Sequence, residues 1–328
     1  MNKKKHILIT AIITLIVFVL SPQIYNLPIF EYNVYNGKAY YEFTEQLKKD
    51  NLLLNKGEND IRIMTVNLLA HYSSWGGKPV NERSHIFFSL RDCYKPDVIG
   101  VQEMCFDWYN EITKNKSDYK FVSPIRTVFP PKMTAIIYNS QTLEVIDSGN
   151  SAFSDTLNFK ARRVVWAVFK VKKTSEIFIV LNTHLDFLDK SKNDENFTKQ
   201  ACEVNKLYTT TKTLDTQYSA PILVIGDFNT KRRVNYQKYV ITSGSYGILN
   251  SLYSDAENLA KFKFNGENMS FDNTLNDHIF IYGEVEINNL SLLSQDIFEK
   301  LSDHFPLLAD ISLWNLFKLL IDQISTMV

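Results

Sequence analysis

Two apolar runs in the second half of the chain are each followed directly by polar side chains. Ile177–Leu181 leads into Asn182-Thr183-His184-Leu185-Asp186, and Ile222–Ile225 leads into Gly226-Asp227-Phe228-Asn229. Runs of aliphatic and β-branched residues of this length are typical of buried strands. Because α/β folds collect their functional groups at strand ends, we expect these side chains to lie at one edge of a sheet. The pattern predicts an α/β fold with a polar site at that edge.

The first half of the chain repeats this arrangement. Ile61–Val66 ends at Asn67, and the run Asp97–Val101 ends at Gln102 and Glu103. A carboxylate delivered by a buried strand suits an oxygen-preferring cation such as Mg²⁺. Each candidate site residue therefore lies at the end or edge of an expected strand. The candidates are Asn67, Glu103, His184, Asp227, Asn229, Asp277, Asp303 and His304.

Seven motifs occur in a fixed order: TVN at 65–67, QE at 102–103, an arginine pair at 162–163, NTHLD at 182–186, GDFN at 226–229, DHIF at 277–280 and SDHFP at 302–306. In this order they resemble the endonuclease/exonuclease/phosphatase superfamily, which has the DNase I-like fold. The resemblance covers roughly residues 60–312. It implies a four-layer α/β sandwich of two packed mixed β-sheets flanked by helices, and a metal-dependent phosphoric ester hydrolase.

Each motif also has an ordinary structural interpretation when it is taken alone. A glutamate after a strand is commonly a solvated turn residue, and Asp227-Phe228-Asn229 fits an Asx-type turn. His184 fits a core histidine with a backbone partner. The order of the seven motifs, and not any single one, favours the catalytic interpretation.

The resemblance assigns roles to five catalytic candidates. It implies that His304 is the general base that activates water and that Asp277 orients it. His184 lies on the opposite side, where it holds a phosphoryl oxygen or assists the leaving group. Asp227 and Asn229 bind or polarise phosphate and water. Histidine suits proton transfer because its pKa lies near neutrality.

A divalent cation is the cofactor that the resemblance implies, Mg²⁺ with Mn²⁺ as the alternative. Glu103 is the expected ligand, Asn67 helps to position the ligands, and Asp303 belongs to the shell around the metal and the histidine. A phosphodiester is an anion, so a cation neutralises charge on the phosphoryl oxygens and stabilises the leaving oxygen.

Arginines provide further candidates for substrate binding. Arg162 opens the expected strand 162–171, and the resemblance implies that it contacts the substrate phosphate, which suits its fork of donors. Arg163 points to the other face of that strand and is expected to face solvent. The run 231–233 fits either a basic lip for an anionic substrate or a solvated loop. His278 faces away from Asp277 and is expected to be a packing or surface histidine.

The partner that orients His184 is not identified by the sequence. We expect it in the neighbourhood of Arg126–Met133.

Composition bounds the domain organisation. The 328 residues, 45% of them hydrophobic, allow one large catalytic domain at 60–312. The 36 basic and 36 acidic side chains give a net charge of zero, which argues against tight non-specific binding to nucleic acid without excluding a nuclease. The three cysteines, Cys93, Cys105 and Cys202, predict no disulfide framework.

The chain begins with a basic cluster, Lys3–Lys5, before the apolar run Ile7–Leu20. Residues 1–21 therefore fit a cleaved signal peptide or an uncleaved membrane anchor, although the apolar run is shorter than the roughly 20 residues of a spanning helix. Residues 22–59 form an N-terminal extension with an expected helix at 39–54. Residues 313–328 form an amphipathic helix that packs on its own domain or contacts lipid.

These signals predict a secreted or membrane-anchored enzyme whose catalytic domain lies outside the cytoplasm. The expected activity is that of an exported Mg²⁺-dependent phosphodiesterase, with a phospholipid or sphingolipid headgroup as the favoured substrate. The enzyme alternative is an extracellular endonuclease acting on nucleic acid. The alternative of another class is a catalytically inactive binding protein on the same fold. No protein partner is evident, and we expect a monomer.

Overall fold

The computed structural model describes residues 42–47, 55–70, 78–122, 133–153, 162–187, 193–236, 239–242, 244–265 and 275–313. All of them fall within the compact unit Ala39–Val328. The expected signal or anchor at 1–21 and the amphipathic stretch beyond residue 313 lie outside the described residues, and of the expected helix at 39–54 only 42–47 is described, as helix. No helix of the described residues is long and apolar enough to cross a membrane.

Two mixed β-sheets form the centre of the unit. The seven-stranded sheet has the order β12 (Phe262–Asn265), β14 (Val285–Leu292), β15 (Leu307–Leu313), β1 (Ile61–Asn67), β2 (Val98–Met104), β4 (Met133–Asn139) and β3 (Tyr119–Phe121). The six-stranded sheet has the order β11 (Ser254–Asp255), β13 (Asp277–Tyr282), β8 (Ile222–Asp227), β7 (Ile177–His184), β6 (Arg163–Val171) and β5 (Leu143–Ala152). A separate hairpin joins β9 (Arg233–Tyr236) to β10 (Tyr239–Thr242).

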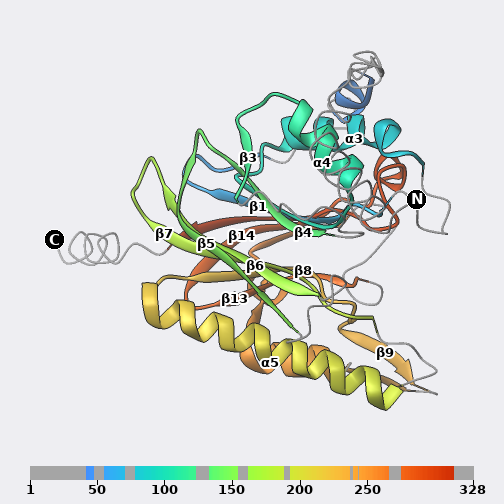
Figure 1. Cartoon of the computed structure of the whole chain (residues 1–328), viewed down its shortest axis with the longest axis vertical. Helices are drawn as coiled ribbons and strands as arrows, with labels where there is room; N and C mark the ends of the chain where they lie inside the picture. The colour runs from blue at the N-terminus through green and yellow to red at the C-terminus, as the bar shows by residue number, and fades with distance from the viewer. Residues whose placement is uncertain are drawn as a thin grey trace, which may run out of the picture. The chain divides into compact units, whose positions relative to one another are not determined.

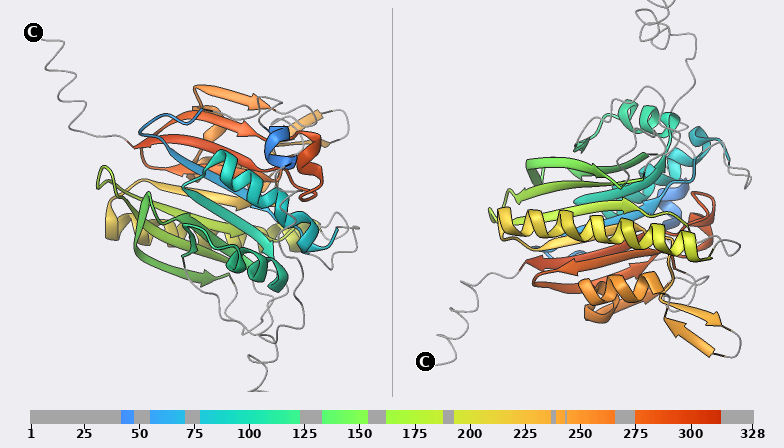
Figure 2. Two further views of the ribbon diagram at one scale, coloured as in Figure 1. Left: turned by 90° about the horizontal axis from the view of Figure 1, so that it is seen from above. Right: turned by 60° about the horizontal axis from the view of Figure 1, so that its bottom comes forward.

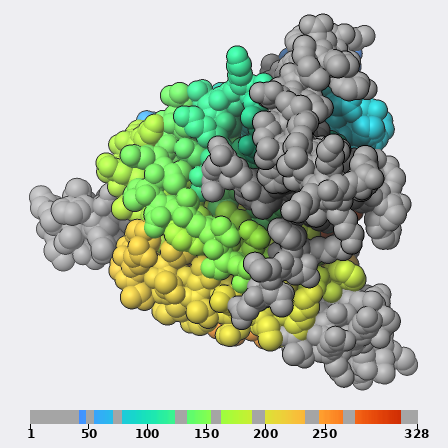
Figure 3. Space-filling view, in the orientation of Figure 1, coloured from blue at the N-terminus to red at the C-terminus, as the bar shows by residue number. Residues whose placement is uncertain are grey.

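Helices cover the outer faces of both sheets (Figures 1 and 2). On the seven-stranded sheet lie α3 (Val80–Tyr94) and α4 (Phe106–Lys114), and α5 (Asn193–Tyr218) and α6 (Gly244–Leu252) lie on the six-stranded sheet. The described residues also include two short helices, α7 (Ala256–Leu259) and α8 (Asp296–Glu299), and the helical segment 42–47. On the face in Figure 3 the edge strand β5, in green, lies above α5, in yellow. The four-layer sandwich expected from the sequence is confirmed.

Three apolar layers hold these elements together, and β1 shows how one strand serves two of them. Side chains alternate across a strand, so Ile61 and Ile63 pack between the two sheets, whereas Met64 and Val66 pack under α3 and α4. All seven residues of β1 are buried. This burial on both faces explains why the central strands appear in the sequence as nearly continuous apolar runs.

The two sheets approach closely near the strand ends. A Cβ atom at Gly100 would stand 2.6 Å from the Cδ1 atom of Ile225 and 2.9 Å from the Cγ atom of Asn182, so a larger residue would require these buried side chains to shift. Beside it, the buried Gln102 amide donates to Asn182 Oδ1 at 2.7 Å and to Thr65 Oγ1 at 3.0 Å. The Nδ2 atom of Asn182 in turn donates to the carbonyls of Val101 at 3.1 Å and Ala135 at 2.7 Å, so buried hydrogen bonds connect the two sheets here, although Gln102 Oε1 has no hydrogen-bond partner among the described residues.

Register places the motif residues at a common edge. The parallel pair β1 and β2 aligns Asn67 with Gln102, and the parallel pair β7 and β8 aligns His184 with Asp227. The antiparallel strand β13 begins opposite, with Asp277 beside Asp227. The polar ends of both sheets therefore meet at one edge of the sandwich, as the sequence predicted.

Candidate active site

Asp227, the last residue of β8, lies at the centre of the polar edge. Its Oδ2 atom accepts a hydrogen bond from the Nδ2 atom of Asn67 at 3.0 Å and lies 3.2 Å from His184 Nε2 and 3.9 Å from His304 Nε2. Its Oδ1 atom accepts a hydrogen bond from the backbone N–H of Asn229 at 2.9 Å. One carboxylate thus joins motif residues from both sheets.

The glycine before Asp227 fixes the backbone conformation that orients this residue. The preceding residue, Gly226, has a φ of +142°, and a Cβ atom there would stand 2.0 Å from the carbonyl oxygen of Thr183. Glycine is therefore required for the chain to turn at this point. The glycine of the GDFN motif has a structural role that the sequence interpretation did not assign.

The second part of the site is a histidine–carboxylate pair. His304 Nδ1 lies 2.7 Å from Asp277 Oδ2, and the His304 side chain is 18% exposed while that of Asp277 is 3% exposed. The turn at residues 302–304 is stabilised because the backbone N–H of His304 donates to Ser302 Oγ at 3.2 Å. Ligand atoms of Asp227, Asp277 and His304 all lie within 4.8 Å of one another.

Burial and charge shift the pKa values of these groups. Burial lowers the pKa of the His184 imidazole. Burial would also lower the pKa of His304, but the carboxylate of Asp277 outweighs it and raises that pKa to about 10. Burial raises the pKa of Asp277 to about 6, against the opposing effect of His304. Burial likewise opposes ionisation of Asp227, but the adjacent His184 and His304 lower its pKa below the usual range.

Glu103 reaches the same edge from β2 through an irregular backbone. The ladder between β2 and β4 shifts register between Val101 and Met104, and Glu103 has a φ of 53°. The Oε2 atom of Glu103 accepts a hydrogen bond from the backbone N–H of Ala70 at 3.3 Å, just beyond the end of β1. A positive φ outside glycine costs about 1–3 kcal/mol and is characteristic of functional sites.

Solved structures with the same arrangement of sheets and helices are known, at low sequence identity. An endonuclease/exonuclease/phosphatase family protein of Bacteroides thetaiotaomicron superposes with a TM-score of 0.62 at 19% identity, over 77% of this chain and 97% of that chain. A mannosyl-6-phosphatase of the same organism gives 0.61 at 18% identity, covering 76% and 99%. The catalytic domain of human Nocturnin, with bound sulfate, gives 0.60 at 18% identity, covering 79% and 97%.

The chain has the endonuclease/exonuclease/phosphatase fold. These similarities confirm the DNase I-like sandwich expected from the motifs. No family model matches this sequence, and no curated protein matches it significantly.

On this fold the residues predicted as metal ligands supply oxygen donors. Glu103 lies beside the β1 end, Asn67 Oδ1 accepts the backbone N–H of Leu69 at 3.0 Å, and Asp303 is an exposed carboxylate next to His304. Asp277 Oδ1 is buried and has no hydrogen-bond partner among the described residues. Carboxylate and amide oxygens are the donors that Mg²⁺ and Mn²⁺ prefer, so these residues fit such a cation. Among the His, Cys, Asp and Glu side chains of the described residues, Asp227, Asp277 and His304 also form a close group of possible ligands.

Arg162 lies directly before β6 and beside the His184 segment. Its Nε atom donates to Asp186 Oδ1 at 3.2 Å, and one terminal nitrogen donates to the carbonyl of His184 at 3.4 Å. The Arg162 side chain is 23% exposed, so part of its guanidinium group remains accessible at the site. Arg163 bonds instead to Asn150 on the neighbouring strand β5, at 3.3 Å.

Helix α5 supplies two supporting residues that the sequence interpretation missed. Gln200 Nε2 donates to the carbonyl of Asp186 at 2.7 Å and to that of Phe228 at 3.1 Å, so one amide joins the loops after β7 and β8. Glu203 Oε2 accepts the backbone N–H of Asp186 at 2.8 Å. The sequence signal that could have identified them is that Gln200 and Glu203 are polar residues three positions apart, on the face of the expected helix that covers the sheet.

Arg232, from the basic run 231–233, and His278 lie in a buried network behind the site. Arg232 is 10% exposed and forms ion pairs with Asp255, at 2.8 Å, and with Glu257, so at this position neither the basic lip nor the solvated loop is correct. His278 is fully buried, with its Nε2 atom 2.8 Å from the Thr230 carbonyl, which confirms a packing role. All three cysteines are free thiols.

Asp227 is one neighbour of His184, with its Oδ2 atom 3.2 Å from His184 Nε2. The stretch Arg126–Met133, where the sequence predicts the orienting partner, lies outside the described residues except for Met133, so that prediction stays a prediction.

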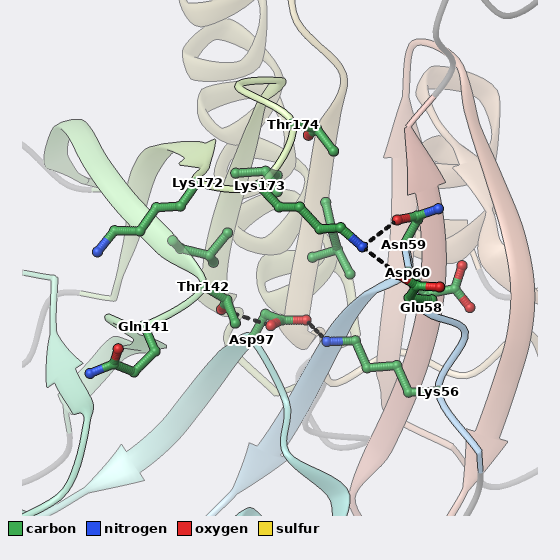
Figure 4. Close-up of a pocket in the computed structure, with 13 residues that line it drawn as sticks. Lys56, Glu58, Asn59, Asp60, Asp97, Gln141, Thr142, Lys172, Lys173 and Thr174 are labelled. Atoms are coloured by element: carbon green, nitrogen blue, oxygen red, sulfur yellow. Dashed lines mark hydrogen bonds and ion pairs between the residues drawn. The ribbon is translucent and has the colours of Figure 1, made fainter.

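A cavity of about 190 Å³ lies at the opposite end of the strands (Figure 4). Lysines and carboxylates line it in pairs: Lys56 with the buried Asp97, and Lys173 with Glu58. Its charged groups neutralise one another, and it is separate from the polar edge described above.

Proposed function

We propose that the protein is a phosphoester hydrolase that uses a divalent cation, Mg²⁺ or Mn²⁺, at the edge formed by β1, β2, β7 and β8. The observation that supports this most is the Asp277–His304 pair beside Asp227, at distances of 2.7 and 3.9 Å. A histidine held by one carboxylate next to a second carboxylate fits proton transfer. A mannosyl-6-phosphatase among the structural neighbours agrees with this class of substrate.

His304 acts as the general base in this proposal. Its Nδ1–H donates to Asp277 Oδ2, which leaves Nε2 as the proton acceptor that faces Asp227. A water placed between Nε2 and the phosphorus atom gives its proton to Nε2, and the resulting imidazolium is stabilised by the carboxylate of Asp277. A His304 pKa of about 10 means that Nε2 carries a proton near neutral pH, so the proposed base is the minor deprotonated form, whose share rises with pH.

Glu103, Asn67 and Asp303 hold the cation in this proposal, with Asp227 adjacent. When bound, the cation neutralises charge on the phosphoryl and leaving oxygens. His184 and Arg162, which lie at one side of Asp227, bind the remaining phosphoryl oxygens, and Asn229 positions the loop through its bond to the Leu185 carbonyl at 2.8 Å.

The proposed substrate is a phosphodiester in a phospholipid or sphingolipid headgroup. Support comes from the Lys3–Lys5 cluster before Ile7–Leu20, which favours export and a position at a membrane, and from the absence of net positive charge. Extracellular nucleic acid is the enzyme alternative, and an inactive binding protein on this fold is the alternative of another class. The complete set of His and carboxylate residues argues against the latter.

A substrate panel tests this proposal. The purified chain with Mg²⁺ is assayed against sphingomyelin, phosphatidylinositol phosphates, plasmid DNA and bis(nitrophenyl) phosphate. Headgroup release from a lipid supports the favoured substrate, nicking of plasmid DNA supports the nuclease, and no turnover of any of them supports the binding protein.

Location needs a separate experiment. We propose that the catalytic domain faces outside the cytoplasm, in a secreted or membrane-anchored monomer. Fractionation with N-terminal sequencing separates the outcomes: a mature N-terminus near Ser21 in the medium supports secretion, and recovery in the cytosol with Met1 intact refutes export.

A further inference from the structure

Arg83, in the first turn of α3, places a charged group inside the molecule. The residue is 2% exposed, and its guanidinium donates to the carbonyls of Leu68 at 2.5 Å, Leu69 at 2.7 Å and Leu301 at 2.8 Å. A fourth bond, at 2.7 Å, reaches the Lys78 carbonyl directly before the helix. Burying a guanidinium is costly unless its donors are satisfied, so four carbonyl partners indicate a specific role for this arginine.

Three of the four carbonyls that Arg83 binds belong to the two segments that deliver candidate site residues. Leu68 and Leu69 directly follow Asn67, and the next residue, Ala70, donates its N–H to Glu103. Leu301 directly precedes the turn at 302–304. One guanidinium therefore joins the cation-binding end of β1 to the turn that contains the general base, although these segments are more than 200 residues apart along the chain.

Leu69 shows that the β1 end needs such support. It has a φ of 50°, which an aliphatic residue adopts only when its surroundings hold it there. Trp108 of α4 assists: its indole Nε1–H donates to the Leu68 carbonyl at 3.1 Å, and the Arg83 guanidinium lies 5.1 Å from the centre of the indole ring. Arg83 and Trp108 thus hold the strained turn after Asn67 from the helix side.

We infer that Arg83 is a positioning residue that sets the distance between the cation-binding group at Asn67 and Glu103 and the Asp303–His304 turn. The inference rests on the proposed function. Arg83 does not itself touch the reacting atoms. Its guanidinium group binds both segments at once and so keeps the general base and the cation at a fixed distance from each other.

Arg83→Lys tests this inference because lysine keeps the charge but cannot bind several carbonyls in a fixed fork. Mn²⁺ affinity is measured directly by titration calorimetry, without substrate, and kcat and KM are measured with bis(nitrophenyl) phosphate. We expect Mn²⁺ affinity and kcat to fall by about tenfold to a hundredfold, with KM little changed, because supporting residues of metal sites have effects of this size.

Arg91→Lys is the matched control. Arg91 lies about two turns further along the same helix, is 4% exposed, and its guanidinium lies 5.1 Å from the Phe88 ring centre. Its bonds go to Asp92 and Asn115, away from the polar edge. We expect Arg91→Lys to lower the melting temperature and to leave Mn²⁺ affinity and kcat unchanged.

Equal Mn²⁺ affinity and kcat in the Arg83→Lys and Arg91→Lys proteins would overturn the inference. If Arg83→Lys does not fold, Arg83→Gln decides instead, because a single amide group has no fork of donors that can span both segments; unchanged Mn²⁺ affinity and kcat there would also overturn the inference. A wild-type protein that binds no Mn²⁺ would refute the cation-dependent function itself, and the inference with it.

Discussion

His304 Nδ1 and Asp277 Oδ2 lie 2.7 Å apart, although the two residues come from different sheets. Asp277 opens β13 of the six-stranded sheet, and His304 stands in the turn that leads into β15 of the seven-stranded sheet. The proposed general base and the carboxylate proposed to orient it are therefore brought together only when the two sheets pack.

Asp277→Asn tests the role of this pair. The amide keeps the size of the side chain but removes the charge that stabilises the imidazolium, so we expect kcat to fall by roughly tenfold to a hundredfold with KM nearly unchanged. Steady-state kinetics, with circular dichroism to establish folding, provide the measurement. A folded Asp277→Asn protein with wild-type kcat would contradict the assignment of His304 as base.

Glu103→Gln tests the cation site. Glutamine keeps one oxygen donor but loses the negative charge, so Mg²⁺ affinity should fall by at least about tenfold and most activity at limiting Mg²⁺ should be lost. Activity is followed as a function of Mg²⁺ concentration. Identical Mg²⁺ titrations of the wild-type and Glu103→Gln proteins would show that this carboxylate is not a ligand.

Glu203 predicts a pH dependence of stability. Burial raises the pKa of its carboxyl group from 4.5 to about 7, so the neutral form of this group is favoured more strongly in the folded state than in the unfolded state. Its stabilising contribution is complete below pH 4.5 and is lost as the pH rises through about 7. Glu203→Gln removes the titration and keeps an acceptor for the Asp186 N–H.

The two proteins are compared by urea unfolding between pH 4.5 and 8. Relative to Glu203→Gln, the free energy of unfolding of the wild-type protein should fall by about 2 kcal/mol over this range. Parallel curves for the two proteins would mean that the Glu203 pKa is not raised by folding.

Arg162→Lys tests substrate binding. A lysine cannot bind a phosphate oxygen pair and the Asp186 carboxylate in one fork, so we expect KM to rise by about tenfold while kcat changes less. Arg163→Lys is the matched control, because Arg163 is the adjacent residue and bonds to Asn150 instead. A larger effect of Arg163→Lys than of Arg162→Lys on KM would reverse the assignment of the two arginines.

The fold was largely predictable because the central strands are buried on both faces. Runs such as Ile61–Val66 and Ile222–Ile225 are visible as apolar segments, and polar residues mark their ends. The strand β7 extends beyond its apolar run Ile177–Leu181, to His184, because its register with β8 continues past Leu181. The hairpin of β9 and β10 was not predicted, because each of its strands has only four residues.

The polar residues at strand ends were identified as site candidates for the same reason, and the structure brings Asn67, His184, Asp227, Asp277 and His304 together. The supporting residues could not be identified. Arg83 and Gln200 lie on helices, where a polar side chain is usually solvated, and their partners are backbone carbonyls that leave no signal in the sequence. Their roles depend on which loops the helices meet, which is decided by tertiary packing.

The most direct test of the central claim is hydrolysis of bis(nitrophenyl) phosphate by the metal-depleted protein before and after addition of Mg²⁺, alongside His304→Ala. We predict no hydrolysis in excess EDTA, recovery of the wild-type rate when Mg²⁺ exceeds the chelator, and almost none of that recovery in a folded His304→Ala protein. Full activity in EDTA, or wild-type turnover by His304→Ala, would contradict a cation-dependent mechanism with His304 as the base.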